Sequence, residues 1–413
     1  MITEFLTLFG NEILLRAFDV IRSFWPIWVP LLLAYVGFQE WLTYKRREWI
    51  KGQGGVLLEV RLPSEQMKSP VSMELFMQSL HQTGVGTITD AFFKGRVRAW
   101  FSLELVSDGG QVHFYIWMHA KWKRGVETQL YSLFPNVEVR EVPDYTLPIK
   151  YDLQKYKYSK MTQMVLTKAD AYPIKSYVDF GLDKDPDEEY KHDPMAPMLE
   201  FLGSLRKGEH AWIQILVQGH IKESLKYGRL IPRPDWKEAA NNEIKEIAKK
   251  AKFKTPEDKG GDSKFLSEEQ KDVIKAIERS IEKPAFDTMI NAFYFSEIEV
   301  NNPNNIGGLL GSFKSFSSNT MNGFKPGFSA DYDYPWQDFG NIRRNFNERR
   351  FLETYKRRSF FNEPFKRFKG KPYILTTEEL ATIYHFPSSM AVATPTLTRI
   401  PSKKAEAPAN LPV

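Results

Sequence analysis

ATP hydrolysis can be sought directly in the sequence, because the residues of a phosphate-binding loop have a characteristic spacing. Such a loop reads Gly-x-x-x-x-Gly-Lys-Ser/Thr, and no stretch of the 413 residues has this pattern. The pair Gly370-Lys371 is followed by a proline, and no glycine stands five residues before Gly370. The sequence therefore predicts that the chain does not hydrolyse ATP by such a loop.

The sequence also contains no pattern typical of a metal site or of a catalytic nucleophile. The chain has no cysteine, which removes disulfides, thiolate metal sites and cysteine nucleophiles. Its seven histidines are scattered, without a His-Glu-x-x-His or His-x-x-Glu-His pattern. The acidic run at 183–189 lacks the ligand spacing and the glycine of a calcium loop, so a solvated loop is favoured. We therefore predict a protein that is not an enzyme and holds no cofactor and no metal.

A basic and aromatic stretch at 341–371 is the strongest chemical signal. It holds eleven Lys and Arg against three Glu, an excess larger than the net charge of +6 for the whole chain. Such a stretch can bind single-stranded nucleic acid through phosphate contacts and base stacking. It also suits anionic lipid headgroups, a protein partner, or a solvated face above a hydrophobic seam. The residues proposed for this surface are Arg343, Arg344, Arg349, Arg350, Arg357, Arg358, Lys366 and Arg367.

The same stretch predicts a helix with two apolar sides. Ile342 with Phe346, and Phe351 with Tyr355, are pairs four residues apart, which become neighbours on a helix. On one ideal helix the two pairs face opposite directions. We therefore expect either a helix that contacts two surfaces or a break between the pairs.

An anchor is expected at the N-terminus. Residues 23–39 carry no charge, and their length approaches the minimum for a membrane-spanning helix. We expect a single-pass transmembrane helix at 23–44, preceded at 1–22 by an interfacial amphipathic helix or by an ordinary buried one. Basic residues directly after the run place the later domains in the cytoplasm, on the inner membrane. The anchor residues are Trp25, Trp28, Tyr35, Trp41, Lys45, Arg46 and Arg47.

Two domains of one kind are expected after the anchor. The strand and helix patterns at 53–148 follow the order β-α-β-β-α-β of a ferredoxin-like sandwich. The order recurs more loosely at 150–330, which we interpret as an internal duplication. A highly charged insertion at 236–283 interrupts the second domain and suits two solvated helices. A sandwich of this kind leaves one sheet face open for a partner.

The remaining chain divides into a helical part and a tail. Residues 331–387 are expected to hold the basic helix and then a short helix capped by Thr376 or Thr377 with acids in its first turn. Proline, threonine, serine and alanine dominate residues 388–413, which predicts an extended tail. The predicted fold is thus α+β: a transmembrane helix, two ferredoxin-like βαββαβ sandwiches, a charged helical insertion, and a basic helix with an extended tail.

The last eighty or so residues also carry a resemblance. Their sequence resembles a segment of bacterial membrane proteins known mostly from candidate-phyla genomes. The resemblance is carried by Tyr334-Pro335-Trp336, by Tyr373-Ile374-Leu375-Thr376-Thr377-Glu378-Glu379 and by Val392-Ala393-Thr394-Pro395. In that family the segment leads into a HerA/TraD-like ATPase of the type IV secretion class, a module without a counterpart in these 413 residues.

The resemblance implies a function without catalysis. The chain would be a membrane-anchored cytoplasmic platform for a separate HerA/TraD-like ATPase in a secretion, conjugation or DNA-translocation machine. Membrane lipid would be a further partner, and assembly as a homo-oligomer is left open. The alternative is a membrane-tethered nucleic-acid-binding module that uses the basic helix at 341–371. The residues proposed for partner docking are Tyr384, His385, Phe386, Pro387, Thr394, Pro395, Leu411 and Pro412.

Overall fold

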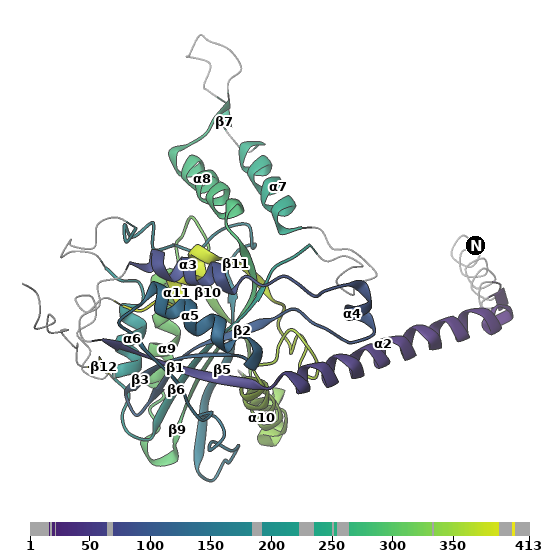
Figure 1. Ribbon diagram of the computed structural model, residues 1–413, viewed down its shortest axis with the longest axis horizontal. Coiled ribbons are helices and arrows are strands. Elements are labelled where there is room, and N and C mark those ends of the chain that lie inside the picture. The colour runs from purple at the N-terminus through teal and green to yellow at the C-terminus, as the bar shows by residue number, and fades with distance from the viewer. Residues whose placement is uncertain are drawn as a thin grey trace, which may run out of the picture.

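One continuous sheet forms the centre of the molecule in the computed structural model (Figure 1). The structure describes residues 16, 19–20, 22–63, 69–183, 192–222, 235–249, 252–253, 264–332, 334–387 and 399–400. Within these ranges the sheet has ten strands, and all their pairings are antiparallel except that of the last strand. The fold is therefore mixed α+β, as the sequence predicts.

The first half of the sheet follows the order of a split β-α-β unit. Its strands lie side by side in the order β2-β3-β1-β4, so the first and third strands occupy the middle. The turn between β2 and β3 is made by Gly109 and Gly110, both at positive φ, where glycine has no steric cost. The elements are β1 (Gly55–Pro63), α3 (Pro70–Leu80), α4 (Ile88–Phe92), β2 (Trp100–Asp108), β3 (Gln111–His119), η1 (Ala120–Trp122), α5 (Lys123–Leu133) and β4 (Glu138–Glu141).

The second half repeats this order with longer strands. Its strands lie in the order β10-β5-β9-β6, which again places the first and third strands in the middle. The elements are β5 (Tyr156–Leu166), α6 (Ala196–Gly203), β6 (Glu209–Gly219), β9 (Ala285–Glu297), η3 (Ile298–Val300), α9 (Asn304–Ser312), η4 (Phe313–Phe316) and β10 (Phe324–Ser329).

The two halves are joined edge to edge, whereas the sequence analysis treats them as two separate sandwiches. Strands β2 and β6 pair antiparallel along their whole length, from Trp100 opposite Gln218 to Asp108 opposite His210. Each strand would otherwise be the exposed edge of its own half, with unpaired backbone groups. Pairing them satisfies these groups and merges both halves into one sheet. We call this pairing the seam.

The charged insertion stands out from the body as two helices between β6 and β9 (Figure 1). Helix α8 carries a full capping box, in which the Ser267 side chain accepts from the Gln270 backbone and the Gln270 side chain accepts from that of Ser267. A small apolar cluster that includes Trp236 and Ile277 holds the pair together. The elements are α7 (Trp236–Lys249), β7 (Lys252–Phe253), β8 (Lys264–Phe265) and α8 (Glu268–Glu282).

Both faces of the sheet are covered. Helices α3, α5, α6 and α9 pack on one face around a large core with Phe76, Leu130 and Leu199. The other face, which the sequence analysis leaves open for a partner, is covered by part of the C-terminal segment through Phe351, Leu352 and Tyr355. That segment contains η5 (Pro335–Gln337), η6 (Phe339–Asn341), α10 (Ile342–Arg357), β11 (Tyr373–Thr376), α11 (Thr377–Ile383) and β12 (Arg399–Ile400).

The predicted transmembrane helix at 23–44 is wrong. Helix α2 (Trp25–Gln53) projects from the body (Figure 1), but among the described residues no helix is long and apolar enough to cross a membrane. The uncharged stretch contains Pro, Gly, Tyr and Gln, which make it less apolar than a membrane span. The same helix also contains Glu40 and Lys45-Arg46-Arg47. This finding overturns the predicted single-pass anchor and the inner-membrane localisation. Most of the expected helix at 1–22, namely residues 1–15, 17–18 and 21, lies outside the described residues.

Candidate functional site

The residues proposed as anchor have two different environments. The aromatic side chains of Trp25, Trp28, Tyr35 and Trp41 are exposed along α2. The basic residues lie where α2 meets the body: Lys45 pairs with Glu48 at 2.8 Å, Arg47 lies 3.6 Å from Glu363, and Arg46 lines a cavity described below.

The proposed basic surface is divided by the structure, because its most central member is buried. The side chain of Arg358 is 1% exposed, and its Nε donates to Glu104 on β2 at 2.9 Å. Its Nη atoms donate to Asp144, one of them at 3.1 Å. A buried arginine with two carboxylate partners is a structural group, since removing either charge would leave the other unpaired in the interior. Arg358 therefore cannot contact nucleic acid or lipid.

This buried cluster lies on the seam. The Glu104 carboxylate also accepts from Ser102, Tyr145 and Gln214, at 2.6, 2.8 and 3.1 Å. Glu104 and Gln214 stand opposite each other on β2 and β6, and Gln214 also donates to the Tyr355 carbonyl at 3.1 Å. The C-terminal end of α10 is thus fixed to both halves of the sheet at once.

The other basic residues of the stretch are more accessible. Arg344 is half-buried and donates to Glu348 at 2.8 Å, and the guanidinium of Arg350 lies 4.5 Å from the centre of the Phe368 ring. Burial raises the pKa of Glu348 although Arg344 opposes the shift. The exposed members are Arg343, Arg349, Arg357 and Lys366. Lys366 and the half-buried Arg367 line the cavity.

Large apolar side chains are exposed at the N-terminal end of α10. Tyr334 and Trp336 stack with their ring centres 4.6 Å apart. The start of the helix is fixed by Asp338, whose carboxylate accepts from the backbone of Arg343 at 2.9 Å and Arg344 at 2.7 Å. We call this group the aromatic patch; its members are Tyr334, Trp336, Phe339, Ile342 and Phe346, exposed by 52%, 65%, 77%, 73% and 63%.

The residues proposed for partner docking near the end of the chain lie in the core. Tyr384, His385 and Phe386 are at most 2% exposed, and Pro387 is buried as well. Burial opposes a charge on His385, but the Asp193 carboxylate at 3.1 Å outweighs it and raises the pKa of the imidazole. These four residues therefore do not form an accessible docking strand. Thr394, Pro395, Leu411 and Pro412 lie outside the described residues.

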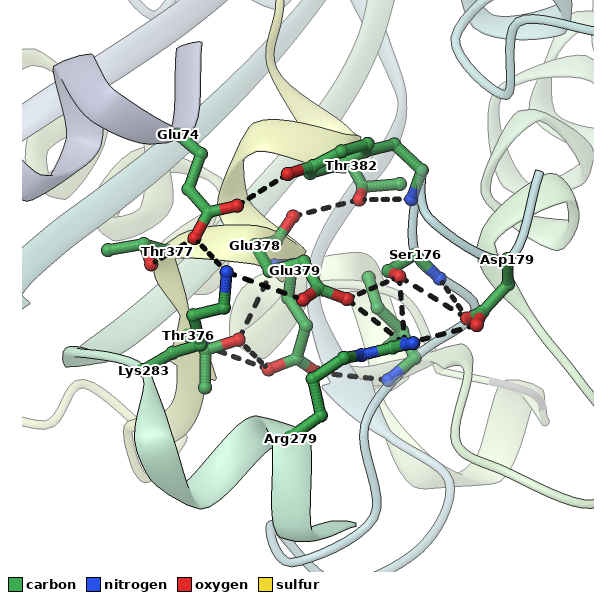
Figure 2. A network of polar contacts seen from close by, with 12 residues as sticks. Glu74, Ser176, Asp179, Arg279, Lys283, Thr376, Thr377, Glu378, Glu379 and Thr382 are labelled. Carbon is green, nitrogen blue, oxygen red and sulfur yellow. Dashed lines mark hydrogen bonds and ion pairs between the residues drawn. The ribbon is translucent and has the colours of Figure 1, made fainter. Parts of the chain in front are cut away.

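Helix α11 is held by a network of polar contacts, which Figure 2 shows. Its capping box is complete: Thr376 and Glu379 exchange backbone and side-chain hydrogen bonds, and Glu379 also accepts from the Ile174 backbone at 2.9 Å. Burial raises the pKa of Glu379 to about 7, although these donors oppose the shift. Since Ile174 belongs to the second half, the network fixes the C-terminal segment to it.

The network continues to α3 and α8 through two acids and two bases. Glu378 accepts from Ser176 at 2.5 Å and lies 3.1 Å from Arg279 (Figure 2). Lys283 donates to Glu74 on α3 at 2.6 Å. Burial raises the pKa of Glu378, with Ser176 and Arg279 opposing. Because every member has a structural partner, we interpret the network as an attachment of α11 and not as a catalytic site.

A cavity of about 580 Å³ lies at the seam, where β6 ends and β9 begins. On its wall the Nδ1 of His220 lies 2.7 Å from Asp287, which also pairs with Arg98 at 3.0 Å. Burial opposes ionisation of Asp287, but the hydrogen bond from His220 and the charge of Arg98 outweigh it and lower the pKa of the carboxyl. We call this space the seam cavity.

Little in the sequence indicates the seam cavity, because its residues come from distant segments. His220 and Asp287 are 67 positions apart. His220 directly follows β6 and Asp287 lies in β9, and the charged insertion separates these two strands. Of the residues proposed from the sequence, Arg46 from the predicted anchor and Lys366 and Arg367 from the basic stretch lie on its wall. Among the described residues no group of three or more histidine, aspartate and glutamate side chains could hold a metal ion.

Comparison with known families assigns the chain to one of them. A family model described as Domain of unknown function (DUF8128) matches residues 39–398. Because the match spans most of the 413 residues, the chain belongs to this family. No curated protein matches it. The family description mentions neither secretion nor conjugation, so these predicted roles have no support.

Proposed function

We propose that this member of the DUF8128 family is a non-enzymatic scaffold that binds a separate HerA/TraD-like ATPase subunit through the aromatic patch. The observation that carries the proposal is the exposure of five large apolar side chains in one short segment. Exposed large apolar side chains that gather on one surface mark interaction sites. The rings of Tyr334 and Trp336 are in direct contact, and Ile342 and Phe346 lie four residues apart on α10. This segment also begins the part of the sequence that resembles the region leading into HerA/TraD-like ATPases in the resembled family.

The composition of the aromatic patch suits a protein partner. Tryptophan, tyrosine and arginine contribute most of the binding energy in protein interfaces. Tyr334 and Trp336 supply the aromatic surface, and the exposed Arg343 next to them, with its guanidinium 5.0 Å from the Tyr332 ring, supplies a polar rim. The other end of α10 is fixed on the seam, so the aromatic patch stands on a rigid support.

Purification of the tagged full-length protein from its native cells tests the proposal. We expect an ATPase with a phosphate-binding loop, identified by mass spectrometry, to co-purify in constant proportion. The double variant Trp336→Ser/Phe339→Ser should lower its recovery at least tenfold. The control Leu147→Ser/Leu153→Ser changes two exposed leucines elsewhere and should recover it like the parent. Equal recovery with both double variants would contradict the proposal.

Nucleic-acid binding is the second candidate, favoured by the stacked Tyr334 and Trp336 and by Arg343 and Arg349, which are exposed on the following helix α10. Aromatic platforms with basic neighbours bind single strands, and the affinity falls steeply with salt. Titration of the full chain with a labelled single-stranded DNA at several salt concentrations tests this reading. The variant Arg343→Glu/Arg349→Glu should reduce the salt slope by about 2. An unchanged slope and affinity would dismiss it.

A further inference from the structure

The seam cavity has the size and composition of a small-molecule site, and it is separate from the aromatic patch. Its volume of about 580 Å³ lies within the range of about 300–1,000 Å³ that is usual for ligand pockets. Its wall combines the ends of β6 and β9, the segment before β2, helix α7 and the loop after α10. A site assembled from both halves and the C-terminal segment is preorganised by the fold itself.

Basic side chains outnumber acidic ones on the wall. Six arginines and lysines face four carboxylates, and the six come from four separate parts of the chain. Basic groups around one concave space focus a positive potential into it, which favours an anionic ligand. The six are Arg46, Arg96, Arg98, Lys222, Lys366 and Arg367.

Two of the four carboxylates already have partners within the protein. Asp287 is engaged by Arg98 and His220, as described above, and Glu243 accepts from the hydroxyl of Tyr172 at 3.1 Å. These contacts reduce the negative potential that the acids contribute to the cavity. Arg98 is itself one of the six basic residues, and Lys222 pairs with Glu238 at 2.8 Å. Pairing therefore engages two of the cations as well as two of the acids, and the cationic excess on the wall stays near the count of six against four.

The wall also offers a surface for a flat ring. Trp236 of α7, which is 8% exposed, and the half-buried Phe361 of the loop after α10 line the same cavity as the basic groups. Phe360 lines it too, but at 1% exposure it belongs to the core behind the wall. Aromatic side chains stack on the flat faces of heterocyclic rings such as nucleobases. The cavity thus combines cationic groups with aromatic ones, which is the chemistry needed by a phosphorylated aromatic ligand.

Backbone strain marks the loop that brings basic groups to this wall. Arg367 and Lys369 adopt φ of 51° and 59°, in the left-handed region that residues other than glycine rarely occupy. Backbone strain of this kind is concentrated at ligand sites. The backbone of Arg367 is held in place by its hydrogen bond to the Phe360 carbonyl at 2.7 Å. The strained conformation thus places a cationic and an aromatic residue on one wall.

From these observations we infer that the seam cavity binds a small phosphorylated ligand with an aromatic ring, of the mononucleotide class. The exposed basic groups at its rim, Arg96 and Lys366, hold the phosphate oxygens as charged hydrogen-bond donors. The ring lies against the aromatic part of the wall at Trp236. His220, oriented by Asp287, provides a further polar contact on the wall.

Calorimetric titration of the full-length protein tests this inference with ATP, tripolyphosphate and adenosine as probes. The variant Arg96→Glu/Lys366→Glu reverses two exposed charges at the rim, so it should keep the parent's melting temperature. The matched control Arg124→Glu/Lys325→Glu reverses two exposed charges outside the cavity. We expect ATP to bind the parent and the control alike, and the rim variant at least tenfold more weakly.

The other two probes separate the two parts of the ligand. If the ring contacts the wall, ATP binds at least tenfold tighter than tripolyphosphate, and adenosine binds more weakly than ATP because it lacks the phosphates. The inference would be overturned by the absence of ATP binding to the parent, by equal affinity of the parent and the rim variant, or by equal affinity for ATP and tripolyphosphate. None of these outcomes depends on the aromatic patch. A failure of ligand binding in the seam cavity would therefore leave the proposed scaffold function untouched, and the reverse also holds.

Discussion

The two ends of helix α10 belong to one basic and aromatic stretch, yet they have opposite environments. At the N-terminal end Ile342 and Phe346 are 73% and 63% exposed. One and a half turns further on, Phe351 and Tyr355 are buried against the sheet, and Arg358 ends the helix inside the protein. The same residue types thus attach the C-terminal segment at one end and remain available for a partner at the other.

The comparison teaches that composition alone does not identify a binding surface. A count of basic and aromatic residues treats Arg343 and Arg358 as equal candidates, although one is exposed and the other is 1% exposed. What distinguishes them is whether acidic partners lie within reach in the folded chain. The predictions below test whether the two ends differ in stability as they differ in burial.

A matched pair of phenylalanines tests the comparison most strongly. Phe351→Ala removes a ring that is 1% exposed and leaves a cavity, so it should lower the free energy of unfolding by about 3–5 kcal/mol. Phe346→Ala, on the same helix, should change it by less than about 0.5 kcal/mol. Urea denaturation of both variants measures the difference. Equal losses would show that the N-terminal end of α10 is packed in solution.

Loss of the buried charge should be similarly severe. Arg358→Ala leaves Glu104 and Asp144 without their cation and should cost about 3–5 kcal/mol. Arg357→Ala removes an exposed side chain 3.7 Å from Glu353 and should cost less than about 1 kcal/mol. Neutralising the acids as well, in Arg358→Met/Glu104→Gln/Asp144→Asn, should restore part of the loss. A mild effect of Arg358→Ala would argue against a buried cluster on the seam.

The attachment of α11 should depend on pH. The pKa of Glu379 is raised to about 7 in the folded state, so between pH 4.5 and 7 the folded protein retains a proton that the unfolded chain releases. The free energy of unfolding should therefore fall as pH rises through this window, by about 3 kcal/mol from this group. Glu379→Gln preserves the capping box but does not titrate, so it should remove this dependence of the unfolding free energy on pH. Identical pH profiles for the variant and the parent would contradict the assignment.

The smallest effect is expected at the cap of the exposed end. Asp338→Ala removes the carboxylate that accepts from the backbone of Arg343 and Arg344, which should cost about 1 kcal/mol. Hydrogen exchange should show faster exchange in the first turn of α10 and unchanged exchange near Tyr355. Faster exchange at both ends would mean that the two ends do not behave independently.

Local patterns in the sequence account for much of the fold. Alternating apolar residues and turn residues place the strands of both halves. Thr376 or Thr377 followed by acids predicts the short capped helix, and the structure shows Thr376 as its cap. The two apolar pairs of α10 are also visible as pairs that face opposite sides. Sequence spacing could not show which pair is buried, because this depends on where α10 lies on the sheet.

Contacts between distant residues explain what the sequence could not show. Arg358 is 254 positions from Glu104 and 214 from Asp144, so nothing near it in the sequence indicates its burial. The seam likewise depends on two strand edges that each look like the boundary of a separate sandwich. The prediction of a transmembrane helix at the N-terminus fails for the opposite reason. It depends on local composition alone, and the helix that forms there is not apolar enough to cross a membrane.

Site-specific photo-crosslinking tests the central claim about the aromatic patch most directly. A photoreactive phenylalanine analogue at Phe339, the most exposed member of the patch, is introduced into the full chain in its native cells, with Leu147 as the control position. We predict a crosslink from position 339 to an ATPase subunit with a phosphate-binding loop, and no such crosslink from position 147. Crosslinks from position 339 only to nucleic acid, or only to a second copy of the chain, would contradict the proposed scaffold function.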